Sequence, residues 1–215
     1  MSATMRDVKN RTGLSLATIS KYLNGGNVLP ENKVLIEEAI KELNYEVNEI
    51  ARGLVKNKTK IVGVMVHDIE SFFSGKLLHF IGRELRKFGY GIMICDSNND
   101  EELEAENLKF LVSRKVDGII VLPVNLKGTF LKPARKRGIP VVLVDRAVQD
   151  EELDCVGIDN KMAAARAVEL LLKNNHRDIA VIASDVEYTG VERIKGYEEA
   201  MRQAGIGVRE EYVKT

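Results

Sequence analysis

The pattern of hydrophobic and polar positions changes character near residue 61. Before that point apolar residues recur at helical spacing, and beyond it short apolar runs alternate with amphipathic stretches. Short apolar runs between turn residues indicate buried strands, whereas i, i+3, i+4 spacing indicates helices. The sequence therefore predicts a small all-α unit followed by a parallel-sheet α/β domain.

Two short helices open the chain. The pattern predicts a helix over about 5–11 capped by Thr4, a turn over 12–14, and a second helix over about 16–23 capped by Ser15. Such a pair is the outline of a helix-turn-helix, whose second helix enters the major groove of DNA. On this spacing alone an ordinary helical hairpin explains the pattern equally well.

The faces of the second helix differ. Ile19 and Leu23 fall on one side at i, i+4 and are expected in the core. The opposite side carries small polar and basic residues, namely Ala17, Ser20, Lys21 and Asn24. That division leaves the second side free to reach a groove.

A third helix is expected over 31–43, directly after Pro30. Its predicted apolar face consists of Val34, Leu35, Ile36, Ala39, Ile40 and Leu43. A short helical stretch capped by Asn48 follows at 48–55, and the basic segment 56–60 has the composition of a linker.

In the second part of the chain, strands are expected at 61–66, 91–95, 118–122, 141–144 and 179–182. Helices are expected near 75–88, 101–114, 130–137, 162–174 and 192–204. Ligands of open parallel sheets bind beyond the carboxyl ends of the strands. Polar residues gather at those ends: His67, Asp68, Asp96, Ser97, Asn98, Asp145, Arg146, Asp159, Asn160, Ser184 and Asp185. The plainer alternative is that Asp, Asn and Ser favour turns and helix caps.

Charge and cysteine content narrow the class of protein. The 215 residues carry a formal net charge of zero, but basic residues concentrate in two blocks, 1–30 and 51–60. Cys95 and Cys155 lie in strand-like apolar surroundings, so we expect buried free thiols. No metal-ligand spacing, secretory signal or membrane span is found in the sequence. We expect a cytoplasmic protein without metal, cofactor or membrane partner.

The order of these segments resembles the lactose-repressor (LacI/GalR) family of bacterial transcription regulators. The resemblance covers the whole chain and is carried by the segments 7–8, 13–25, 42–45, 48–52, 72–73, 117–120, 139–142, 156–160 and 193–197, together with Leu54. It implies a helix-turn-helix DNA-binding domain over 1–46, a hinge helix and linker over 47–60, and an effector domain over 61–215. The effector domain would have the fold of type I periplasmic binding proteins, with a first lobe over about 61–160 and a partial second lobe over about 161–215.

The resemblance also implies roles for residues of the head. Leu16, Ala17 and Lys21 match positions that face base edges, and Thr18, Ser20 and Asn24 match phosphate-contacting positions. The remaining candidates for DNA contact are Thr4, Ser15, Asn48 and Arg52. Family members usually carry arginine where this chain has Lys21, and lysine lacks the planar bidentate fork. Base discrimination at that position is therefore expected to be weaker or differently aimed.

Leu54 matches the residue that inserts into the minor groove and kinks the operator. Packing against the α/β domain is the alternative role for this leucine. Because a helix of so few residues is marginal in water and contains Gly53, we expect the 48–55 segment to be poorly ordered away from DNA and to fold on the operator.

For the effector, Phe72 and Phe73 match aromatic positions at the mouth of the family's cleft, and Asp145 and Arg193 match polar positions that hold the ligand. Further candidates are Arg146 and Asp159. Aromatic rings beside a carboxylate and a guanidinium suit a sugar or a sugar acid. The alternatives are a surface ion pair for Arg193 and core packing for one of the two phenylalanines.

The sequence departs from the family pattern at several positions. Lys9 and Thr12 stand where alanines let the first two helices pack closely, and Val47 replaces the usual proline before the hinge. Near Phe72 the chain is one residue shorter than usual, which could move both phenylalanine assignments by one. The family continues beyond Thr215 through the rest of a second lobe, so the sequence is expected to be a fragment or a truncated relative.

The function that follows is a homodimeric, sequence-specific regulator, a repressor of a carbohydrate-utilisation operon, that reads a palindromic operator and is controlled by a sugar effector. A secreted solute-binding protein shares the α/β fold, but the first sixty residues and the missing signal disfavour it. A nucleotide-dependent enzyme is disfavoured because neither a G-x-G-x-x-G nor a Walker motif follows the first strand, and the three histidines show no triad or metal spacing.

Overall fold

The computed structural model describes residues 3–46, 58–148, 153–184 and 188–215. The chain divides into two compact units, residues 1–59 and residues 60–215, which are described separately below. None of the helices in the described ranges is long and apolar enough to cross a bilayer.

The described part of the first unit, residues 3–46, contains three helices: α1 (Met5–Thr12), α2 (Leu16–Leu23) and α3 (Pro30–Glu42). Both predicted caps are confirmed as N-cap residues. Ser15 Oγ accepts from the Thr18 backbone N–H at 3.1 Å, whereas Thr4 donates its own N–H and hydroxyl to the carboxylate of Asp7. Gly13, with a φ of 71°, ends α1 in the left-handed conformation that glycine adopts without a steric penalty.

A small hydrophobic core joins the three helices. Its buried members are Val8, Ile19, Ile36, Ala39 and Tyr45. Two contacts tie α3 to the other helices at the surface: Arg11 pairs with Glu42 at 2.8 Å, and the Tyr22 hydroxyl donates to Glu37 at 2.7 Å. The bond to Glu37 raises the pKa of Tyr22.

The predicted apolar face of α3 is wrong at two positions. Val34 is 53% exposed and Leu35 is 42% exposed, whereas Ile36 and Ala39 are buried. Among the described residues α3 packs on two short helices, so it buries a narrow stripe, and the residues directly before that stripe stay outside it.

The second unit begins with a five-stranded parallel sheet. Its strands are β1 (Ile61–Val66), β2 (Gly91–Asp96), β3 (Gly118–Val121), β4 (Val141–Val144) and β5 (Asp154–Val156), in the order β2-β1-β3-β4-β5. The connections contain α5 (Phe72–Lys87), α6 (Glu101–Ser113), the 3-10 turn η1 (Thr129–Leu131) and α7 (Lys132–Lys136). The predicted parallel α/β fold is confirmed.

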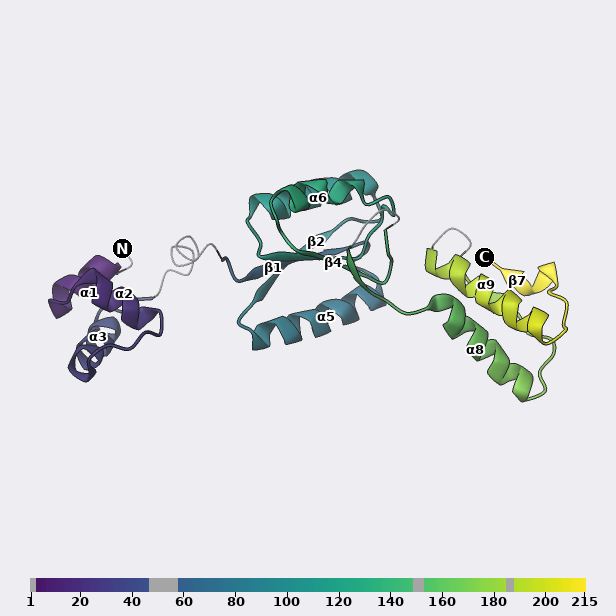
Figure 1. Cartoon of the computed structure of the whole chain (residues 1–215), viewed down its shortest axis with the longest axis horizontal. Helices are drawn as coiled ribbons and strands as arrows, with labels where there is room; N and C mark the ends of the chain where they lie inside the picture. The colour runs from purple at the N-terminus through teal and green to yellow at the C-terminus, as the bar shows by residue number, and fades with distance from the viewer. Residues whose placement is uncertain (1–2, 47–57, 149–152, 185–187) are drawn as a thin grey trace. The chain divides into compact units, whose positions relative to one another are not determined.

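Helices cover both faces of this sheet, with α5 and α6 on opposite sides (Figure 1). The larger core lies under α6 and α7 and includes Leu108, Leu111, Leu131 and Leu143. On the α5 side the buried residues are Val64, Val66 and Leu122. Burial on both faces explains why the central strands have no polar alternation.

The rest of the chain packs around a helix pair, α8 (Asn160–Lys173) and α9 (Tyr188–Gln203). Beside them are η2 (Glu210–Tyr212) and the two-stranded parallel sheet of β6 (Val181–Ile182) and β7 (Val213–Lys214). A Cβ added at Gly196 of α9 would lie 2.0 Å from the Lys161 carbonyl oxygen of α8, so this close crossing requires glycine.

Several boundaries differ from those predicted. Helix α5 begins at Phe72 rather than near Gly75, and β6 begins at Val181 rather than Ile179. The strands β5 and β7 were not predicted, because two or three residues are too few for a period to be recognised. Cys95 is buried as predicted, but Cys155 lies on the edge strand β5 and is exposed, so that prediction is wrong.

Candidate nucleic-acid interface and ligand site

The solvent-facing side of α2 carries the residues that sequence analysis assigned to base edges. Ala17 and Lys21 are exposed, and Leu16 is 39% exposed, whereas Ile19 at the centre of the helix is fully buried. The core thus fixes the rotation of α2 about its own axis. A short helix held in this way presents one defined face to a groove.

The hydroxyl and amide groups around that face bond to one another. Ser15 Oγ and Thr18 Oγ1 are 2.9 Å apart, and Asn24 Nδ2 donates to the Ser20 carbonyl at 2.8 Å. At the start of α1, bonds from the Thr4 side chain and backbone lower the pKa of Asp7. These contacts orient the groups predicted to meet phosphate.

A hollow of about 540 Å³ adjoins the same face. It is lined by Ala17, Thr18, Lys21, Asn27, Val28, Leu29 and Asn32. The last four belong to the α2–α3 connection and the start of α3 and are not among the residues predicted from the sequence. The signal that could have found them is the Gly25-Gly26 turn, which folds this connection back onto Lys21.

Gly26 touches Lys21 directly. Its N–H donates to the Lys21 carbonyl at 2.8 Å, and a Cβ added at Gly26 would lie 2.7 Å from Lys21 Cγ. Contacts under 3.0 Å are not tolerated without a shift of the neighbour. The absence of a side chain at Gly26 therefore decides where the stem of Lys21 lies.

The structure accommodates Lys9 and Thr12, the two residues of α1 that depart from the family pattern. Lys9 is exposed, as expected for a side chain that extends into water. The Thr12 hydroxyl donates to the Val8 carbonyl at 2.8 Å and accepts from the Leu14 N–H at 3.3 Å. Thr12 thus joins the end of α1 to the turn instead of leaving a polar group without a partner. The hinge candidates Asn48, Arg52 and Leu54 lie outside the described residues.

At the carboxyl edge of the five-stranded sheet lie four of the effector candidates. Phe72 and Phe73 open α5 with exposed fractions of 81% and 46%, so neither ring belongs to the core. Asp145 and Arg146 follow β4 with mostly buried side chains, and Arg146 Nε lies 3.8 Å from Asp145 Oδ2. Asp145 has a φ of 70°. A non-glycine residue in this conformation is uncommon and marks a tightly defined turn.

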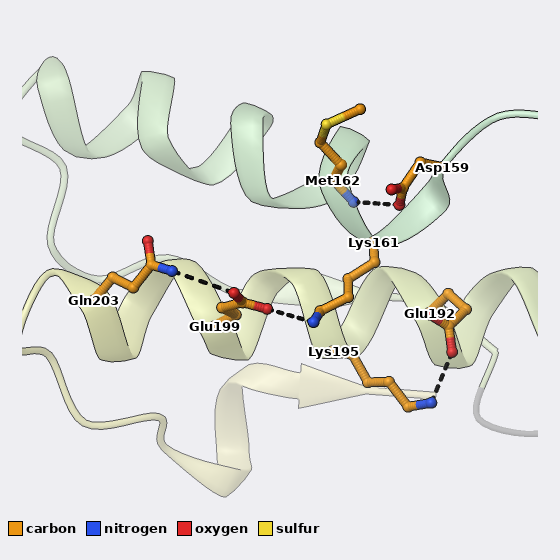
Figure 2. Close-up of polar contacts among 7 residues, drawn as sticks. All are labelled: Asp159, Lys161, Met162, Glu192, Lys195, Glu199 and Gln203. Atoms are coloured by element: carbon orange, nitrogen blue, oxygen red, sulfur yellow. Dashed lines mark hydrogen bonds and ion pairs between the residues drawn. The ribbon is translucent and has the colours of Figure 1, made fainter.

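The other two candidates lie on the α8–α9 pair. Asp159 caps α8 by accepting from the Met162 N–H at 2.8 Å, which is the capping role given above as the plainer alternative (Figure 2). Arg193 Nε donates to Asn160 Oδ1 at 2.9 Å, so the partner of Arg193 is an amide. Beside them Lys161 of α8 pairs with Glu199 of α9 at 2.6 Å, and Gln203 also donates to Glu199 (Figure 2). The hydrogen bond between Lys161 and Glu199 raises the pKa of the lysine and lowers that of the glutamate.

Glu104 is a buried polar residue at the carboxyl edge of the five-stranded sheet, and it was not predicted from the sequence. Its side chain is fully buried, and it accepts from the backbone N–H groups of Val124 at 2.7 Å and Asn125 at 3.0 Å. Burial raises the pKa of Glu104 to about 7, although both hydrogen bonds and the charge of Arg146 act in the opposite direction. Glu104 therefore fastens the loop after β3 to α6. No helical or strand period could have marked it.

A helical head with an exposed polar helix, joined in sequence to a parallel α/β unit with polar strand ends, is the architecture of regulators that combine a helix-turn-helix with a domain of periplasmic-binding-protein type. Residues 59–215 match the family model described as periplasmic binding proteins and sugar binding domain of the LacI family. Catabolite control protein A of Priestia megaterium is 32% identical over 216 residues, which cover 99% of this chain and 65% of that protein.

Two solved structures extend the comparison. The transcriptional regulator CelR in complex with cellobiose matches with a TM-score of 0.61 and 27% identity, over 99% of this chain and 65% of that one. The lac repressor dimer bound to operator and the anti-inducer ONPF matches with a TM-score of 0.84 over 96% of this chain and 64% of that one. At 20% identity, the second match establishes the fold.

The chain belongs to the LacI family. It spans 65% of the length of catabolite control protein A. The proteins in this comparison are named for transcriptional control and not for a catalysed reaction, which agrees with the expectation that the chain is not an enzyme.

Proposed function

We propose that this chain is a sequence-specific DNA-binding regulator, acting as a repressor of a carbohydrate-utilisation operon, whose affinity for its operator is controlled by a small-molecule effector. The observation that carries the proposal is the α2 face. Ile19 is fully buried beneath it while Ala17 and Lys21 are exposed, and this is the arrangement that a recognition helix needs.

Within this proposal each group on the head has a role. Lys21 reaches guanine O6 and N7, while Leu16 and Ala17 make apolar contact with base edges. Thr18, Ser20 and Asn24 bind phosphate oxygens together with Thr4 and Ser15, and Asn48, Arg52 and Leu54 act from the hinge. Two heads of a homodimer read the two halves of a palindromic operator. A protein with this task acts in the cytoplasm, and we propose that location.

The effector that we propose is a sugar or a sugar derivative. The exposed rings of Phe72 and Phe73 can stack on the apolar face of a pyranose, and Asp145 and Arg146, at the same edge of the sheet, can bond to its hydroxyl groups. Arg193 and Asp159 remain candidates from the α8–α9 pair. The family description that matches residues 59–215 names a sugar binding domain, and CelR was solved with cellobiose, which supports this class of ligand.

Gel-shift titration of a library of palindromic duplexes with the 215-residue chain tests the DNA-binding proposal. The expected result is a bound fraction that survives about 200 mM salt, with affinity at least roughly a thousandfold above that for unrelated duplexes. If every retained sequence binds with the same salt-sensitive affinity, the proposal is wrong.

A second titration addresses the effector. Candidate sugars are added to the complex with the selected duplex, in parallel for the native chain and for Asp145→Asn. A sugar that shifts DNA affinity for the native chain and has a weaker effect on the variant supports the proposed ligand class. If phosphorylated or nitrogenous compounds shift DNA affinity and sugars do not, the sugar assignment fails while the DNA-binding proposal stands.

A further inference from the structure

A groove of about 410 Å³ lies between α6 and α7, and its lining residues are not among the candidates for DNA or effector binding. Lys109 and Ser113 line it from α6, and Lys132, Pro133 and Lys136 line it from α7, together with Arg137. We call it the α6–α7 groove. Its size falls within the range of small-molecule sites.

The groove combines an apolar lining with a concentration of basic residues. Four of its lining side chains are cations, and among the described residues no carboxylate forms an ion pair with Lys109, Lys132, Lys136 or Arg137. The sequence accounts for this, because residues 118–144 contain Lys127, Lys132, Arg135, Lys136 and Arg137 but no Asp or Glu. The nearest preceding acid on α6 is Glu106, and no ion pair joins it to Lys109. In a chain with no net charge, this is a strong local excess of positive charge.

The walls of the groove are fixed by the core. Leu131 and Ala134 hold η1 and α7 from below with no exposed surface, and Leu108 and Leu111 do the same for α6. Arg137 Nη1 donates to the Val112 carbonyl at 3.3 Å, which anchors the guanidinium at the groove. The backbone that carries these four cations is therefore rigid, and a ligand would have to order side chains but not the helices.

We propose that the α6–α7 groove is a binding site for a small polyphosphate anion, separate from the effector cleft. Lysine ammonium groups bind phosphate as point charges, and a guanidinium binds it with paired N–H donors. Lys132 and Lys136 are one helical turn apart on the same face of α7, so they can meet two phosphoryl groups of one ligand. A concave site of this volume suits a free small molecule rather than the convex backbone of a duplex.

Isothermal titration of the 215-residue chain with inorganic pyrophosphate, at low salt and without divalent cations, tests the site. The double variant Lys132→Gln with Lys136→Gln removes two exposed cations from the groove. The matched control, Arg166→Gln with Lys173→Gln, removes two exposed cations from α8 and changes the net charge equally. In parallel, acylation of lysines followed by mass spectrometry reports whether pyrophosphate protects Lys132 and Lys136.

The proposal predicts that the groove variant binds pyrophosphate at least about tenfold more weakly and that the control stays within about twofold of the native chain. Lys132 and Lys136 should be protected from acylation and Lys173 should not. An undetectable affinity of the native chain, or equal losses in both variants, would overturn the proposal. If the groove variant loses affinity for non-specific duplex DNA but keeps its affinity for pyrophosphate, the groove contacts nucleic acid and the small-molecule site is refuted.

Discussion

The solvent-facing side of α2 depends on Gly26, because this residue without a side chain leaves room for the stem of Lys21. Lys21 is the only basic side chain on that helix, and its stem occupies the space that a Cβ at Gly26 would need. The backbone oxygen of Lys21 is almost as close, at 2.9 Å from the added carbon. A methyl group at this position therefore cannot be accommodated by moving only the end of a flexible side chain.

Gly26→Ala is expected to displace Lys21 and to lower the free energy of unfolding by about 1–3 kcal/mol through overpacking. Specific operator affinity should fall by at least about tenfold, while affinity for unrelated duplexes changes little. Urea unfolding and gel-shift titration measure the two effects. Gly207→Ala is the control, because a Cβ at Gly207 meets nothing within 4 Å. Equal behaviour of the two variants would contradict the assigned role of Gly26.

Because of Glu104, the free energy of unfolding should fall as the pH rises, which is the opposite of the usual effect of a carboxylate. Its pKa of about 7 lies above the ordinary value of 4.5, so the folded state holds this proton more tightly than the unfolded chain does. The stabilising contribution is therefore complete below about pH 4.5 and is lost as the pH rises through 7, by up to roughly 3 kcal/mol in total.

Urea unfolding at a series of pH values tests this prediction on the native chain and on Glu104→Gln. The variant should be less stable at low pH, because an amide cannot accept from both Val124 and Asn125 with the same geometry. Its unfolding free energy should also fall less steeply between pH 5 and 7.5. Parallel pH profiles for the two proteins would mean that Glu104 does not titrate in this range.

Sequence alone identified the residues whose roles are local. Thr4 and Ser15 were recognised because an N-cap is encoded within a few positions of the helix that it serves. Glu104 and Gly26 were missed because their partners lie beyond the reach of a local pattern or within an irregular turn. Asp159 had two roles available from sequence, and its bond to Met162 establishes the capping role while leaving the proposed ligand contact as a prediction.

At the scale of elements, α2 relies on its cap more than a longer helix would. It has eight residues, no acidic residue in its first turn and a single basic residue in its last. Helices of this length are marginal by themselves, so tertiary contacts of Ile19 and the cap at Ser15 hold it together. The cap also orients Thr18, which is a candidate for phosphate contact.

Ser15→Ala should destabilise the head by about 1 kcal/mol, because the Thr18 N–H loses its acceptor. Ser15→Asp supplies a carboxylate acceptor and should recover most of that loss. Thermal unfolding followed by circular dichroism, with the head observed as its own transition, measures both effects. If alanine and aspartate are equally destabilising, the hydrogen bond from Thr18 is not the source of the stability.

Elements were predicted best where a clear hydrophobic pattern ends at a turn or cap residue. Helices α1, α2 and α6 and strands β1 and β4 were found nearly at their observed boundaries, since each shows helical spacing or an unbroken apolar run between such residues. The strands β5 and β7 escaped notice because their pairing with β4 and β6, rather than their own sequence, makes them strands. The exposure of Val34 and Leu35 likewise depends on how few neighbours α3 has.

At the scale of the whole molecule, a net charge of zero conceals separate charged regions. The basic residues of the head, the linker and the α6–α7 groove are offset by acidic segments elsewhere, such as the start of α6. Only the basic residues of the head and the linker were recognised from sequence. Those of the α6–α7 groove come from two separate segments, which only the fold brings together. Because different basic residues bind the two ligands, the affinity for operator and the affinity for pyrophosphate should each fall with rising salt concentration at its own rate.

The central claim is that the exposed face of α2 reads DNA sequence. The most direct test is selection of binding sites from random duplexes, performed in parallel with the native chain and with Lys21→Ala. We predict that the native chain enriches a two-fold symmetric site and that the variant loses base preference at one position in each half-site while keeping the symmetry. Enrichment of the same site with the same base preferences by both proteins, or of no site by the native chain, would contradict the claim.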